Sequence, residues 1–223
     1  MSTGPQPGVA RPAGVLDRLR GNRTRLVLTS GTLLFVELML IRWVPAEVRY
    51  IGFFSNFLLM ASFLGIGIGI LLGRRRGLNT IALFPIVLVI VVWLISTLEL
   101  NVQVKSTSEL FFGLAESTAA DVNFLVLPLV FALVATMMAS LAIPLGPLLR
   151  SMPPLQAYAW DITGSMVGIA GFTILSAAGT PPAVWFTVIA VLVVVLMAGS
   201  ADTGWLKYLA AAALAFVIYL GYN

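Results

Sequence analysis

The sequence predicts an all-α fold: a multi-pass transmembrane helical bundle with about seven spans and a cytoplasmic N-terminus. Three observations support this class. Of the 223 residues, 60% are hydrophobic and 10% are charged, whereas soluble domains average about 45–50% apolar and about 25% charged residues. The apolar residues fall in runs close to the ~20 residues that a transmembrane helix needs, separated by breaks rich in proline, glycine or charge. The basic residues gather at those ends of the runs that would share one side of a membrane.

Residues 1–24 form a separate region, rich in proline and glycine at first and in arginine later. They lack the large apolar side chains of a packed core, so we expect a disordered basic cytoplasmic tail ahead of a transmembrane bundle over residues 25–223. Arg18, Arg20, Arg23 and Arg25 precede the first apolar run and favour a cytoplasmic N-terminus. A signal peptide is the weaker alternative, because no A-x-A-like cleavage site follows the run.

The first apolar segment, residues 26–43, contains an acid in its middle and a base near its far end. Glu37 lies too deep to reach water easily, so it needs a partner, a proton or a water-filled cavity. Arg42 can extend to the interface beside Trp43. The two charges are five positions apart and do not stack well on one helical face. We therefore expect the partner of Glu37 to lie on another helix.

The second segment, residues 50–72, is followed by three arginines at 74–76. Gly65, Gly69 and Gly73 recur every four residues, a glycine-zipper pattern that lets another helix backbone approach closely. The same region could be mistaken for a nucleotide-binding glycine loop. That interpretation needs a preceding strand and a soluble helix after it, whereas the flanks here are continuous apolar residues.

The third and fourth segments are residues 78–96 and 122–141, and residues 97–121 between them carry four acids against one lysine. We expect this connection to be an ordinary solvated loop; an acidic vestibule that attracts cations is the alternative. Prolines beyond residue 143 indicate a turn region before the next segment.

The fifth segment, residues 158–176, is long and apolar enough to cross a bilayer, yet it carries a carboxylate. Asp161, Gly164 and Gly168 fall on one helical face with Ser165 beside them. An acid is costly against lipid and glycine offers lipid little to pack against, so we expect this face to turn inward. Residues 183–197 and 205–222 complete the seven segments; the former is near the lower length limit for a span.

The charge distribution also limits function. With the N-terminus in the cytoplasm, only Arg49 and Lys105 among the loop bases fall outside. The bases do not alternate with aromatic residues, so we expect a lipid bilayer as partner and no nucleic acid. The chain has no cysteine and no histidine, which removes disulfides, Cys/His zinc sites and histidine-based triads. We expect no catalytic residue, cofactor or metal.

Four stretches resemble the membrane-embedded N-terminal region of bacterial spermidine synthase-like membrane proteins: ELMLIRW at 37–43, residues 49–75, AYAWDITGSMVGIAGF at 157–172 and TPPAVWF at 180–186. In that family a multi-pass region precedes a soluble domain of the aminopropyltransferase type. The resemblance covers most of residues 26–220 and implies a multi-pass protein of the bacterial inner membrane. The sequence stops where the soluble domain should begin, so synthase activity is not carried over and the chain alone is not expected to be an enzyme.

Three hypotheses about function remain. The chain is a scaffold or anchor for a soluble aminopropyltransferase-like domain or partner, or a structural subunit of a larger membrane complex, with its buried charges locking helices together. Alternatively, Glu37 and Asp161, with Arg42 and Asn56 near them, bind or transport a cation such as a proton or, as the resemblance implies, a polyamine. An intramembrane enzyme ranks lowest, because without cysteine or histidine few nucleophile–base pairs remain.

Overall fold

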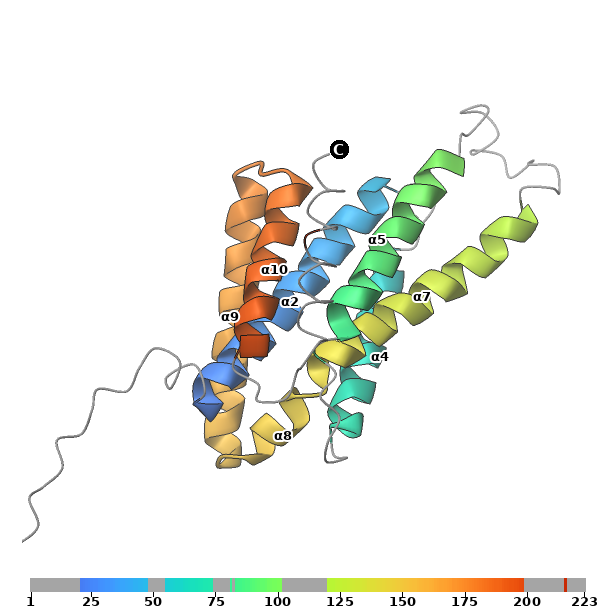
Figure 1. Ribbon diagram of the computed structural model, residues 1–223. Coiled ribbons are helices and arrows are strands. Elements are labelled where there is room, and N and C mark those ends of the chain that lie inside the picture. The colour runs from blue at the N-terminus through green and yellow to red at the C-terminus, as the bar shows by residue number, and fades with distance from the viewer. Residues whose placement is uncertain are drawn as a thin grey trace, which may run out of the picture.

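The computed structural model describes residues 21–47, 55–73, 81, 83–101, 120–198 and 215. All elements in this part of the chain are helices, and no strand occurs in it (Figure 1). In chain order they are α2 (Asn22–Glu47), α4 (Ser55–Leu72), α5 (Leu83–Asn101), α7 (Ala120–Ala142), the six-residue α8 (Leu145–Arg150), α9 (Pro154–Ala177) and α10 (Pro182–Ala198). The all-α expectation is therefore confirmed for the described residues. The seventh expected segment, residues 205–222, lies outside them except for residue 215.

Helix α2 is the centre of the bundle, because it contacts each of the other six described helices. Its buried side chains include Leu26, Leu33, Val36, Met39 and Leu40, spaced so that they point in several directions around the helix axis. A helix that is apolar on nearly all sides is buried on nearly all sides. Helix α9, in contrast, packs one face on α2 and exposes the other (Figure 1).

The two most extensive helix pairs, α2 with α9 and α4 with α7, both run parallel. Along the first pair, Gly31 lies beside Gly168 and Phe35 beside Phe172, so the numbers rise together. Along the second pair, Gly65 lies beside Ala135 and Gly69 beside Ala139. Gly73, directly after α4, lies beside Ile143, directly after α7. Helix α10 runs opposite to α2, since Trp43 near the end of α2 packs on Phe186 near the start of α10. These directions are those of a chain that reverses at each successive long helix.

A tight turn joins α9 to α10. Gly179 adopts a φ of 69°, a left-handed conformation that is cheap only for glycine. Thr180 stabilises the turn from both sides: its Oγ1 donates to the Leu175 carbonyl at 2.8 Å and accepts from Trp185 Nε1 at 2.8 Å. Pro182 then occupies the first position of α10, where its missing N–H costs nothing.

Two described runs, Asn22–Glu47 and Leu127–Arg150, are long and apolar enough to cross a membrane, as judged by length and composition. Shorter apolar helices span 56–72, 83–96 and 182–198. Helix α9 has 24 residues, so its length suffices, yet it is not among the two. We attribute this to Asp161 and the many small and polar residues around it. The expectation that 158–176 is apolar enough is thus not supported, and neither are about seven spans.

Candidate functional site

The polar contacts of the described core concentrate where α9 crosses α2. Asp161 is half-buried and faces α2. Ser30, only 1% exposed, donates a hydrogen bond from its Oγ to Asp161 Oδ1. The acid therefore meets a hydroxyl of the central helix.

Glycines bring the backbones of α2 and α9 together next to the Ser30–Asp161 hydrogen bond. A Cβ atom on Gly164 would lie 2.5 Å from the Val27 carbonyl oxygen, and one on Gly31 would lie 2.9 Å from the Gly164 carbonyl oxygen. Gly168 is closer still to Gly31. Only glycine permits this approach, since real Cβ contacts are longer than 3.0 Å. The space beside Asp161 is therefore filled by main chain.

Farther along the same pair, aromatic rings and Arg42 continue the interface. Phe35 packs edge-on against Phe172 at 5.5 Å between ring centroids, and Phe172 packs against Trp185 at 5.3 Å. Arg42 Nη1 donates to Ser176 Oγ, and the guanidinium lies 5.7 Å from the Trp185 ring centroid. This arrangement is a hydrogen bond combined with a cation–π contact. Arg42 therefore links α2, α9 and α10 and does not pair with Glu37.

Glu37 has the opposite environment from Asp161. Its side chain is 3% exposed, and its Oε1 atom accepts no hydrogen bond. Glu37 follows Ser30 by seven residues, two helical turns, so it lies on the Ser30 side of α2 and away from Gly31. On α4, the fully buried hydroxyl of Ser62 is also without a hydrogen bond. An orphaned buried carboxyl oxygen is costly, so it marks Glu37 as a candidate for function.

The remaining predicted residues lie elsewhere. Asn56 is exposed at the start of α4, and Ser165 is half-buried beside Gly164. Among Glu37, Arg42, Asn56 and Asp161, no hydrogen bond or ion pair joins any two. The expected grouping of the two acids with Arg42 and Asn56 does not form: Asp161 and Arg42 each bind a different serine, and Glu37 Oε1 has no hydrogen bond.

The predicted glycines of α4 lie against α7 and the turn that follows it. A Cβ on Gly69 would lie 2.5 Å from the Ala139 carbonyl oxygen, and Gly65 and Gly73 approach Ala135 and Ile143 more closely. Gly67 points elsewhere and has open space around it. The α4–α7 pair thus repeats the close backbone packing of the α2–α9 pair.

Sequence reasoning did not identify Ser30, Ser176 or Trp185 as parts of these contacts. The run TSGT at 29–32 was the available signal for Ser30, because four small or hydroxylated residues in the middle of an apolar segment favour an interhelical face. In the described part of the chain, no three acidic side chains come together in a way that could hold a metal ion.

These features define the described part of the chain as a helical bundle with two glycine-lined parallel contacts, α2 with α9 and α4 with α7. Hydroxyl and arginine hydrogen bonds add to the contacts of the central helix α2. Comparison of the chain with known protein families, with curated proteins and with solved structures found no match.

Proposed function

We propose that this chain is a multi-pass module of the bacterial inner membrane, with about seven spans, that anchors a soluble aminopropyltransferase-like domain or partner. The observation that carries the proposal is the use of its polar groups. Asp161 and Arg42 both bind hydroxyls on a neighbouring helix, and glycine backbones fill the space between them. Groups arranged in this way hold helices in fixed positions, which suits a scaffold more than a transport path.

Exposed apolar side chains support the membrane part of the proposal. Large apolar residues on the outer faces of α4 and α9 are at least 61% exposed: Met60, Phe63, Leu71, Met166, Val167 and Ile174. Lipid acyl chains would cover these side chains without cost, whereas large apolar patches are rare on the surfaces of soluble monomers. The nature of the partner rests on the sequence resemblance alone.

Co-fractionation tests the anchoring role. The chain is expressed in bacteria together with a separate soluble aminopropyltransferase-like protein, and membranes are isolated and washed with carbonate. The chain itself should remain in the washed membranes. Before the wash, the soluble protein should sediment with membranes only when the chain is present. A soluble protein that stays in the supernatant in both cases would refute the anchoring role.

A second function is favoured by Glu37, whose buried Oε1 atom has no donor. A carboxyl group in this position is suited to bind a proton or an amine that enters the bundle. Uptake of labelled spermidine into cells or vesicles tests this candidate. Transport that is lost in Glu37→Gln and kept in a Ser165→Ala control would support it, and absence of uptake by the unmodified chain would leave only the anchoring proposal.

A further inference from the structure

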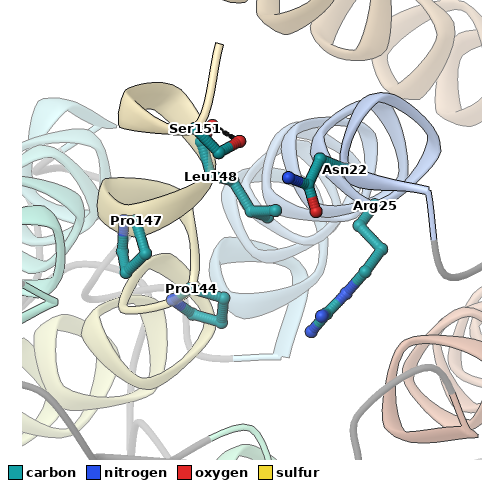
Figure 2. Close-up of a pocket in the computed structure, with 6 residues that line it drawn as sticks. All are labelled: Asn22, Arg25, Pro144, Pro147, Leu148 and Ser151. Atoms are coloured by element: carbon teal, nitrogen blue, oxygen red, sulfur yellow. Dashed lines mark hydrogen bonds between the residues drawn. The ribbon is translucent and has the colours of Figure 1, made fainter.

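A small pocket lies at the basic end of the bundle, apart from the contacts described above. It has a volume of about 310 Å³ and is lined by Asn22 and Arg25 of α2 and by Pro144, Pro147, Leu148 and Ser151 around α8 (Figure 2). One side is therefore apolar and the other carries a guanidinium and an amide. No acidic residue lines it.

The polar side of the pocket retains hydrogen-bond donors. Ser151 Oγ donates to the Leu148 carbonyl at 2.7 Å, so its proton is already used. The side chains of Arg25 and Asn22 have no hydrogen bond or ion pair with any other described residue. A guanidinium with five N–H donors and an amide beside it match the oxygens of a phosphate group.

The position of the pocket along α2 indicates which molecule supplies such a phosphate. Leu26, fully buried, begins the apolar run of α2 directly after Arg25. In the membrane module proposed above, the pocket would therefore lie at the level of the lipid headgroups. Arg23 and the exposed Arg150 at the same end raise the local positive potential, as in polybasic lipid sites.

We propose that this pocket binds the phosphate headgroup of an anionic phospholipid of the cytoplasmic leaflet. Arg25 and Asn22 contact the phosphate, while Pro144, Pro147 and Leu148 contact the glycerol and the first acyl carbons. The proposal rests on the membrane location inferred above, but it does not depend on any soluble partner.

Lipid binding by the full-length chain in detergent tests the proposal, with native mass spectrometry as readout. Phosphatidylglycerol and phosphatidylcholine with identical acyl chains are compared. The chain should retain phosphatidylglycerol preferentially. Arg25→Gln should weaken this binding roughly tenfold, because a charge-assisted hydrogen bond is lost. Arg23→Gln, an equal change of charge two residues away and outside the pocket, should weaken binding less, by about fivefold at most, because Arg23 adds only to the general positive potential.

Asn22→Leu provides a second variant that removes a donor without changing the net charge. It should also weaken phosphatidylglycerol binding, and thermal unfolding of each variant shows that the fold is intact. Equal loss in Arg23→Gln and Arg25→Gln would indicate diffuse charge attraction and overturn the proposal, as would an absent preference for phosphatidylglycerol. Full competition by millimolar inorganic phosphate would assign the pocket to a soluble phosphate and also overturn it. A chain that stays in carbonate-washed membranes yet shows no lipid preference would refute this inference alone.

Discussion

Asp161 and Glu37 carry the same carboxyl group, yet their surroundings differ in a way that separates structure from possible chemistry. Asp161 accepts a hydrogen bond from Ser30 across the α2–α9 contact. Glu37 is more deeply buried and has an orphaned oxygen. At this scale, the first acid links two helices, and the second is the one whose burial has no structural explanation in the described residues.

Removal of the Ser30 hydroxyl should destabilise the bundle. In Ser30→Ala, Asp161 Oδ1 loses its donor, and interhelical hydrogen bonds of this kind contribute about 0.6–1.7 kcal/mol. We expect a loss of about 1 kcal/mol, measured as a lower unfolding midpoint in detergent. Thr163→Ala is the control, because the Thr163 hydroxyl donates only to Ala159 on its own helix. An equal midpoint for Ser30→Ala and the unmodified chain would contradict the link.

A double-mutant cycle isolates the same contact. Asp161→Ala and Ser30→Ala should together cost less than the sum of the single changes, because each of them removes the same hydrogen bond. Unfolding midpoints of the unmodified chain, the two single variants and the double variant give the coupling free energy between the two side chains. Strict additivity would mean that the Ser30–Asp161 hydrogen bond adds nothing to stability.

The sequence identified the two acids and Arg42 because a charged side chain in an apolar segment is energetically costly, but it did not identify their partners. Ser30 and Asp161 are 131 positions apart, and Arg42 and Ser176 are 134 apart. Helical spacing determines which residues share a face of one helix, whereas it carries no information about which helix packs against that face. The partners therefore required coordinates.

At the scale of elements, the glycines of α2, α4 and α9 determine how closely helices approach. The glycines of α4 and α9 could be read from their four-residue spacing, since small residues at i and i+4 form one face. Gly31 is the single glycine of α2, so this spacing did not identify it. Helix α4 contains glycines that pack against another helix and one that does not: Gly65 and Gly69 contact α7, whereas Gly67 faces open space. This contrast allows a matched test of the close packing.

Gly168→Ala should destabilise the bundle by about 1–3 kcal/mol, because the new methyl group collides with the Gly31 backbone. Gly67→Ala should instead be neutral or stabilise by up to about 1 kcal/mol, since it meets nothing within 4 Å and lowers the entropy cost of the helix. Unfolding midpoints in detergent measure both. A Gly168→Ala protein as stable as Gly67→Ala would contradict the α2–α9 contact.

At the scale of the whole molecule, the helix directions agree with the charge distribution. Helices α2 and α9 run one way and α10 the other, so the start of α2, the end of α8 and the start of α9 share one end (Figure 1). Arg23, Arg25 and Arg150 lie at this end. In the membrane module proposed above, the positive-inside rule would place this end in the cytoplasm.

Single-cysteine labelling tests this orientation, because the chain contains no cysteine of its own. In intact cells made permeable at the outer membrane, a membrane-impermeant thiol reagent should label Ala178→Cys at the α9–α10 turn. Ser151→Cys, at the other end, should react only after the inner membrane is opened. Both positions are exposed. The reverse pattern would invert the topology, and equal labelling would argue against a crossing between them.

The sequence predicted the helical class and most helix locations from the apolar runs, but it did not indicate which helix lies at the centre of the fold. The structure has α2 there. Segment hydropathy cannot distinguish a helix that is apolar because it is surrounded by protein from one that is apolar because it faces lipid. The expected seven spans are not reproduced because the apolar helices at 56–72, 83–96 and 182–198 are shorter than the two candidate spans, and residues 205–222 lie outside the described residues except for residue 215.

The parallel contact of α2 with α9 has a consequence for biosynthesis. A ribosome adding about 5–20 residues per second needs on the order of ten seconds to progress from Ser30 to Asp161. Throughout that interval the Ser30 hydroxyl of α2 lacks the carboxylate that accepts its hydrogen bond. The contact between α2 and α9 can therefore form only late in synthesis, after the chain has been extended beyond Asp161.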